Sequence, residues 1–184
     1  MDEARRWGRK IFDLDKSKAS RKKVESYLQS QKPELVILNG HGHNRAIGGH
    51  DNEEIINMSN ARILKNATVY ARACSAGKVL GQEIVNQGAK AFIGYKEDFL
   101  FFKNEIDFKD PLKDDYAQPF FESSNQVATS LLKGKTPKEA HIDSMKSHLK
   151  WIEKLSTTAA GDRAFLIPFI KWNACFQVCI TEKV

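Results

Sequence analysis

The sequence lacks any long hydrophobic run. No apolar stretch approaches the about 18 residues that a membrane-spanning helix needs, and residues 1–6 lack the apolar centre of a signal peptide. The three cysteines are an odd number at wide spacing, so they do not form a disulfide framework. These absences predict a cytoplasmic protein that works in a reducing compartment and makes no membrane contact.

Aromatic side chains are also scarce where the positive charge is concentrated. Residues 1–33 hold ten Lys or Arg against five Asp or Glu, and therefore carry +5 of the net charge of +6. Trp7, Phe12 and Tyr27 are the aromatic residues in this range, and we see no platform on which bases could stack. We interpret the cluster as the solvated face of one or two helices and do not expect a nucleic-acid partner.

What the sequence does contain is the composition and pattern of one globular α/β domain. Its 184 residues are 41% hydrophobic and 28% charged. Apolar runs predict strands at 35–39, 68–73 and 90–95, and residues 78–87 predict a helix between the last two. A strand–helix–strand order implies a right-handed crossover and parallel strands. We expect a three-layer sandwich in which a mainly parallel sheet has these strands side by side and helices on both faces.

The remaining pattern completes this outline. Because the 35–39 strand is apolar on both faces, it is typical of the centre of a parallel sheet. The capping box that runs from Thr136 to Glu139 starts a helix to about Leu155. The predicted inward face of this helix consists of Ile142, Met145, Leu149 and Ile152. The other helices are predicted at 3–12, 20–31 and 119–133. A loop is predicted at 42–52, and two final strands at 163–170 and 174–180.

A first strand is missing from the outline. A sheet of this kind normally begins with one, and we find no strong strand before residue 35. Either residues 9–12 serve weakly in this role, or the chain is a fragment of a longer protein. We favour the fragment.

Two of the predicted strands end in residues that carry chemistry. The first leads into Gly40-His41-Gly42 and the second into Cys74, and parallel strands place both ends at one edge of the sheet. A thiol beside an imidazole forms an activated nucleophile, with His41 as general acid and base. We expect the N-terminus of the following helix to lower the pKa of the Cys74 thiol. The N–H groups of Gly42 and Cys74 would bind an oxyanion, and no cofactor would be needed.

Three other interpretations stay open. Cys74 could be an inert buried cysteine, as Cys175 and Cys179 on the last predicted strand are expected to be. Zinc could be held by His41 and His43 with His50 or Cys74, although no HExxH, paired CxxC or clear carboxylate partner completes such a site. The third interpretation is a serine hydrolase with Ser75 in a nucleophile elbow and His141 or His148 as its base.

Taken together, these motifs resemble the caspase-like cysteine peptidases, which include caspases, separases, gingipains and CHAT-type domains. In that group one strand ends in His-Gly and a later strand ends in the nucleophilic Cys, followed by small residues. The matching segments are 40–42, 73–77, 80–94 and 131–140, so that the resemblance runs from about 20 to 180. It implies a cysteine endopeptidase with His41 and Cys74 as its catalytic dyad and a protein or peptide as its substrate.

The resemblance also implies a substrate preference. In separase-like members an acidic residue just after the third of these strands faces a basic P1 side chain, and the matching residues are Glu97 and Asp98. Either carboxylate could select Arg or Lys through a charge-assisted pair. Asn39, at the end of the first predicted strand, is a further candidate for substrate binding.

Residues 96–118 have no clear period and hold four phenylalanines among charged residues. So long a connection beside the proposed site is a candidate lid, autoinhibitory plug or partner-docking surface. With the missing first strand, it suggests weak activity in the isolated chain and regulation by a protein partner or an additional domain. A catalytically latent interaction module remains an alternative. The phenylalanines are Phe99, Phe101, Phe102 and Phe108.

Overall fold

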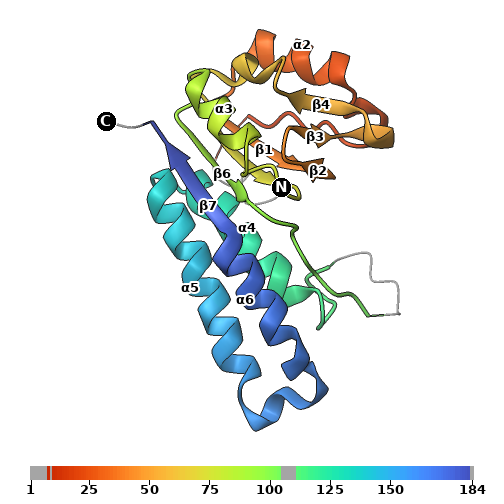
Figure 1. Cartoon of the computed structure of the whole chain (residues 1–184), viewed down its shortest axis with the longest axis vertical. Coiled ribbons are helices and arrows are strands. Elements are labelled where there is room, and N and C mark those ends of the chain that lie inside the picture. The colour runs from red at the N-terminus through yellow and green to blue at the C-terminus, as the bar shows by residue number, and fades with distance from the viewer. Residues whose placement is uncertain (1–7, 9, 105–110, 183–184) are drawn as a thin grey trace.

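The computed structural model describes residues 8, 10–104 and 111–182. Within these ranges the chain is an α/β protein with a mixed, mostly parallel four-stranded sheet, a small antiparallel sheet and five α-helices. Figure 1 shows the two sheets in one half of the molecule, while α4, α5 and α6 run side by side into the other half.

The four-stranded sheet has the order β1-β5-β6-β7. Its strands are β1 (Leu35–Asn39), β5 (Thr68–Arg72), β6 (Ala91–Tyr95) and β7 (Gln177–Thr181). The first three are parallel and β7 is antiparallel to β6. The prediction that the first three strands lie side by side and parallel is therefore confirmed.

β1 lies at an edge of the sheet, and the expectation of a central strand was wrong. Among the described residues it pairs only with β5. Val36 and Leu38 are buried in the core, whereas Ile37 on the opposite face is 37% exposed. Lys10, Ile11 and Phe12 form no strand beside it, and residue 9 lies outside the described ranges. One face and one edge of an apolar strand are thus left uncovered.

The segment predicted as a loop at 42–52 is a β-hairpin followed by a 3-10 turn. The small sheet contains β2 (Gly42–His43), β3 (Ala46–Gly48) and β4 (Glu54–Asn57). Ile47 and Ile56 are fully buried, so the hairpin packs on the core even though it is rich in Gly and His. The short 3-10 helices of the N-terminal half are η1 (Lys16–Lys18), η2 (His50–Asn52) and η3 (Ala61–Leu64).

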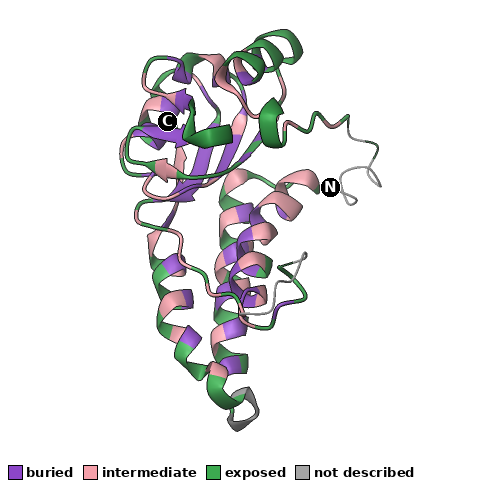
Figure 2. Cartoon of the chain, turned by 90° about the vertical axis from the view of Figure 1, so that its right-hand side faces the viewer, coloured by how far each residue is buried: buried purple, intermediate pink, exposed green. Residues whose placement is uncertain are grey.

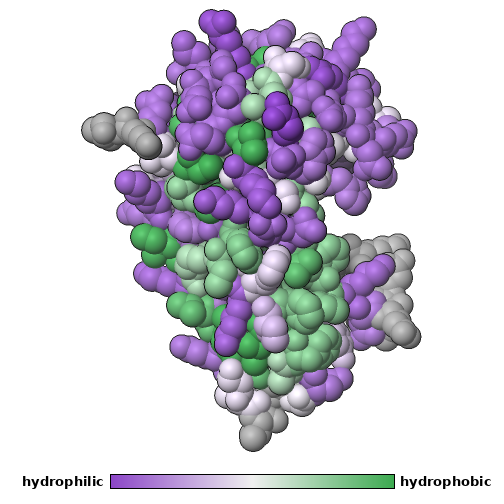
Figure 3. All heavy atoms as spheres, in the orientation of Figure 1, coloured by the Kyte–Doolittle hydropathy of each residue, from purple (hydrophilic) through white to green (hydrophobic). Residues whose placement is uncertain are grey.

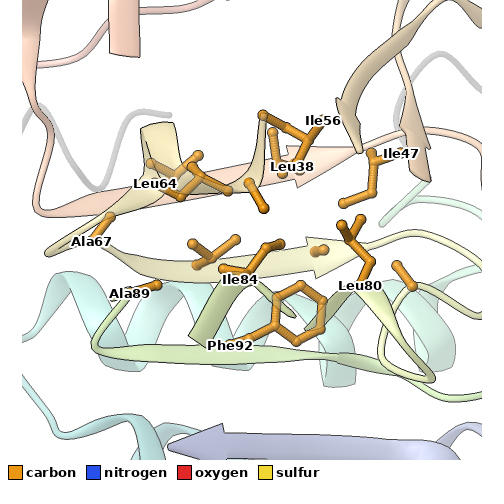
Figure 4. Close-up of a cluster of buried hydrophobic side chains, with 14 of the residues drawn as sticks. Leu38, Ile47, Ile56, Leu64, Ala67, Leu80, Ile84, Ala89 and Phe92 are labelled. Atoms are coloured by element: carbon orange, nitrogen blue, oxygen red, sulfur yellow. The ribbon is translucent and has the colours of Figure 1, made fainter. Parts of the chain in front are cut away.

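Helices cover both faces of the main sheet. On one face, α2 (Arg21–Gln31), α3 (Leu80–Asn86) and the small sheet enclose the largest hydrophobic cluster, which Figure 4 shows around Phe92 and Ile84. On the other face, α4 (Gln118–Leu132) and α5 (Pro137–Leu155) pack against Tyr70, Ile93 and Tyr95. Buried residues accordingly concentrate in the strands and along the inner sides of α4 and α5 (Figure 2).

The predicted strand at 163–170 was wrong, because this segment is helical. It spans the end of the 3-10 segment η4 (Thr158–Leu166) and the start of α6 (Ile167–Phe176). Pro168 stands in the first turn of α6, where a missing N–H is tolerated, and Ile170 and Asn173 are buried three residues apart. Cys175 consequently lies exposed on a helix, and only Cys179 is on β7.

The capping box at Thr136 and Glu139 is confirmed, but the predicted inward face of α5 was wrong in part, since only Ile152 of its four residues packs against a core cluster. Ile142 and Leu149 are 49% and 57% exposed. The face that α5 buries is partly polar, because Ser144 and His148 enter a hydrogen-bonded network between α4 and β7. Its buried residues are Ala140, Ser144, His148, Trp151 and Leu155.

Some apolar side chains therefore face solvent in the helical half. Figure 3 shows hydrophobic residues gathered on the surface over α6, whereas the surface over the sheet and α2 is mostly hydrophilic. None of the described helices is both long and apolar enough to cross a membrane. The predicted helix at 3–12 lies mostly outside the described ranges, and residues 10–12 are not helical.

His148 makes folding stability depend on pH. Its ring is fully buried, Nδ1 donates to the Ser144 carbonyl oxygen at 2.8 Å, and Nε2 has no hydrogen-bond partner. Burial lowers the pKa of His148 from its usual value near 6.5 to about 4. The neutral ring is thus favoured in the folded state. The contribution of His148 to the free energy of unfolding is therefore fully present above pH 6.5 and is lost as the pH falls towards 4.

We expect His148→Leu to flatten this dependence. Between pH 6.5 and 4 the wild type loses up to about 3 kcal/mol of unfolding free energy through this residue. Urea unfolding of both proteins across that range measures the difference, and an NMR titration of the His148 ring measures its pKa independently. Parallel stability curves for the two proteins would contradict the assignment.

Candidate functional site

The candidate site lies at the carboxyl ends of the parallel strands. In the β1–β5 register Asn39 faces Arg72, and the Gly40 N–H donates to the Arg72 carbonyl oxygen at 3.4 Å. His41 and Cys74 each follow two residues after this last pair of the register. The ring of His41 is exposed and Cys74 is partly exposed. The two residues predicted as a dyad are therefore brought to the same edge of the sheet.

Two glycines allow His41 to lie against the cysteine loop. A Cβ atom on Gly42 would lie 2.8 Å from both the Cys74 carbonyl oxygen and the Ala73 Cβ. A Cβ atom on Gly40 would overlap the Gly48 carbonyl oxygen. The pattern Gly-His-Gly is thus required by close backbone contacts on either side of the histidine. No hydrogen bond joins the His41 ring to the Cys74 thiol in the described part of the chain.

The backbone of Gly42 is suitably placed to donate to a ligand. The Gly48 N–H donates to the His41 carbonyl oxygen at 2.9 Å, so these two residues form a hydrogen-bonded pair of the hairpin. Gly42 pairs with Ile47 at the next, non-hydrogen-bonded position, where backbone N–H groups point away from the partner strand. The Gly42 N–H is therefore directed away from β3, on a residue that touches the Cys74 backbone.

The surroundings of the Cys74 thiol differ from those that we predicted. Burial raises the pKa of the thiol, and hydrogen bonding to the Asp98 carboxylate raises it further. The N–H groups of Phe99 and of Cys74 itself act in the opposite direction. The helix expected to lower the pKa begins only at Leu80, six residues after the cysteine, and it has seven residues. The expectation of a lowered pKa was wrong.

Ser75 contacts a carboxylate and not an imidazole. Its backbone has the left-handed conformation (φ 57°), and its Oγ donates to Asp98 Oδ1 at 3.4 Å. The two candidate bases are engaged elsewhere. His141 lies 3.0 Å from Gln177 Oε1, and His148 is buried on the inner side of α5.

The two acidic candidates for substrate binding have different surroundings. Glu97 forms a 2.8 Å ion pair with Lys78, so a cation already neutralises its charge. Asp98 is exposed and, among the described residues, no cation lies within 4 Å of its carboxylate. The Trp172 Nε1–H donates to its carbonyl oxygen at 3.0 Å and fixes the backbone there. Asp98 is therefore the carboxylate that can receive a basic side chain beside Cys74.

Sequence reasoning missed Arg72. It is the last residue of β5, two residues before Cys74, which lies in the turn that follows the strand. Its NH1 group donates to Ser124 Oγ at 3.0 Å and to Asn125 Oδ1 at 2.9 Å, and the guanidinium lies 4.7 Å from the Phe121 ring centroid. A single cation in an otherwise apolar strand was the available signal. Asn39, exposed at the end of β1, is its register partner.

The start of the long connection after β6 is packed into the molecule. Phe99 contacts Tyr95 and Phe121, with ring centroids 4.9 and 6.0 Å apart. Phe102 packs at 4.6 Å from Phe169. Phe101 remains 49% exposed, and Phe108 lies outside the described residues. In residues 98–104 these aromatic side chains thus anchor the chain to α4 and α6, in contrast to the expected lid.

The histidines proposed as alternative zinc ligands have other neighbours. His43 Nε2 lies 3.4 Å from Glu54, and His50 Nε2 lies 3.4 Å from Asp51. Across the ranges given above, no cluster of three or more His, Cys, Asp or Glu side chains could hold a metal ion.

The close approach at Gly42 gives a direct test of the geometry. We expect Gly42→Ala to displace the hairpin from the cysteine loop, because both neighbours of the added methyl group are backbone or core atoms. The rate at which iodoacetamide alkylates Cys74, and any catalytic rate at the site, should differ strongly from those of the wild type. Gly48→Ala on the same hairpin is the matched control, since its Cβ meets only ordinary contacts at 3.6 Å. Equal behaviour of the two variants would contradict the packing.

The carboxyl ends of the parallel strands therefore bring together the Cys74 thiol, His41, the Gly42 N–H that points away from β3, and the Asp98 carboxylate, which has no cation beside it among the described residues. Comparison of this chain with models of protein families, with curated proteins and with solved structures finds no match.

Proposed function

We propose that this protein is a cysteine endopeptidase of the caspase-like type, with Cys74 as nucleophile and His41 as general acid and base. The observation that carries the proposal is the contact of Gly42 with the backbone of Cys74, which brings the His41 loop and the thiol loop together. The parallel order of β1, β5 and β6 supports a caspase-like sheet. The Gly42 N–H supplies a donor for the oxyanion that forms when the thiolate attacks a carbonyl group.

The position of Asp98 favours a substrate with a basic residue at P1. An Arg or Lys side chain would form a charge-assisted pair with this exposed carboxylate. The same pairing would favour the thiolate, because the Asp98 charge is one of the causes that raise the pKa of the Cys74 thiol. A basic substrate would thus activate the nucleophile that cleaves it. The resting thiol stays protonated and weakly reactive until such a substrate arrives.

The substrate is a protein or peptide, and we propose that a protein partner or an additional domain regulates the chain. The support for a partner lies in β1, whose outer edge and exposed Ile37 are uncovered among the described residues. β1 leads directly into His41, so that a strand added to this edge would lie next to the catalytic loop.

Cleavage of a positional-scanning peptide library tests the proposal. We expect the wild type to cleave peptides after Arg or Lys and Cys74→Ala to lose this activity. If neither protein cleaves any peptide, the chain is the latent interaction module instead. A serine hydrolase would be identified by fluorophosphonate labelling of Ser75 with no iodoacetamide effect at Cys74. That alternative lacks a histidine beside Ser75 among its hydrogen-bond partners.

A further inference from the structure

β7 is the second edge of the main sheet and has free backbone groups. It pairs only with β6 among the described residues. The Lys96 N–H donates to the Phe176 carbonyl oxygen, and antiparallel alternation then directs the backbone groups of Val178 and Ile180 toward β6. The N–H and C=O groups of Cys179 and Thr181 point outward. An edge of this kind accepts an extended segment as an additional strand.

A groove follows this edge. It has a volume of about 440 Å³ and is lined by four consecutive residues of β7, 177–180, together with residues that come from either side of the strand. Gly77, Lys78 and Gln82 lie on the α3 side, and His141 lies on α5. The groove therefore runs along the strand, where a bound chain could form hydrogen bonds with it.

The nitrogen-containing ionisable side chains that line the groove are all basic. Lys78, Lys96 and His141 line it, and no carboxylate does. Lys138 adds a fourth basic group, which counteracts the rise that burial causes in the pKa of the Cys179 thiol. Lys78 is paired with Glu97, but no carboxylate among the described residues lies within 4 Å of Lys96 or Lys138. An extended segment here would meet cations on both sides of β7.

We propose that this groove binds an extended acidic peptide segment of a partner protein, which adds a strand to β7 and places Asp or Glu side chains against Lys96 and Lys138. A second copy of the chain fits less well, because two such edges would bring the same basic residues together and the net charge is +6. The proposal concerns binding alone and does not depend on catalysis by Cys74.

The test uses a fluorescein-labelled peptide of alternating Glu and Val, with a Lys–Val peptide of equal length for comparison. We expect saturable binding of the Glu–Val peptide in fluorescence anisotropy, weakened by salt, and no comparable binding of the Lys–Val peptide. Lys96→Glu/Lys138→Glu should weaken the Glu–Val complex by about tenfold or more and improve binding of the Lys–Val peptide. Lys150→Glu/Lys171→Glu, on exposed positions of α5 and α6, makes the same change in net charge and should leave binding intact.

Thr181→Pro tests the added strand. It removes an outward N–H and no bond to β6, so it should weaken the complex while circular dichroism and the melting temperature stay near wild type. Equal binding of the two peptides, wild-type affinity after charge reversal at Lys96 and Lys138, or equal losses in both double variants would overturn the proposal. A stable dimer in sedimentation that excludes the peptide would assign the edge to a second copy and overturn it as well.

Discussion

Cys74→Ala and His41→Ala should each remove nearly all peptidase activity. In the proposed mechanism the thiol forms the acyl intermediate, and the imidazole moves the protons that make the thiol a nucleophile and the amine a leaving group. Because the two groups act as a unit, each single substitution should lower kcat/KM by about 10³-fold or more, and the double variant should lose little beyond that. Initial rates on the best library peptide, with active-site titration by a peptidyl acyloxymethyl ketone, measure the effect.

A second cysteine and a second histidine provide matched controls. Cys175 is an exposed cysteine on α6, and Cys175→Ala should keep wild-type turnover and wild-type inhibitor labelling. His43 is exposed two residues after His41 on the same hairpin and contacts Glu54, so His43→Ala should retain most activity. Activity that survives in Cys74→Ala, or that falls equally in His43→Ala and His41→Ala, would exclude the proposed dyad.

Much of this edge of the sheet could be predicted from the sequence. The runs that precede Gly40 and Cys74 are short, apolar and followed by small residues, a local signal that needs no tertiary information. Parallel pairing then brings the two ends together. The capping box at Thr136 is equally local, since its two hydrogen bonds join residues three positions apart.

The failures share a tertiary cause. Residues 164–170 are so uniformly apolar that periodicity does not separate a strand from a helix. On α5 the apolar residues Ile142 and Leu149 lost the inward face to Ser144 and His148. Gln177 and Ser123 of α4 supply hydrogen-bond partners for the Ser144 hydroxyl, and the His148 ring bonds to the Ser144 carbonyl oxygen. No local pattern reports such partners, since they come from distant parts of the chain.

The thiol environment could not be predicted for the same reason. The expected pKa depended on a helix N-terminus a few residues away, whereas the groups around the sulfur come from Asp98 and Phe99, which follow a different strand. The sequence identified Asp98 as a candidate substrate ligand. Its second role, as a charge that adds to the rise that burial causes in the thiol pKa, follows only from its position beside Cys74.

This double role leads to the prediction with the most distinctive outcome. Asp98→Asn keeps the size of the side chain and removes its charge. Preference for Arg over a neutral P1 residue should fall by about 10- to 100-fold, the worth of one hydrogen bond to a charged group. At the same time the thiol pKa should fall, so that iodoacetamide alkylates Cys74 faster near pH 7.5. The variant would thus be less selective and yet more reactive.

Glu97→Gln is the matched control for Asp98→Asn, because Glu97 is adjacent in sequence but is already paired with Lys78. It should change neither the P1 profile nor the alkylation rate by much. Library profiling and alkylation rates across pH, measured on the same three proteins, give both readouts. Slower alkylation in Asp98→Asn would contradict the electrostatic role of the carboxylate. A wild-type profile that favours acidic P1 residues would assign the specificity to Arg72, which ends β5 two residues before Cys74 and, in the described chain, has no carboxylate within 4 Å of its guanidinium.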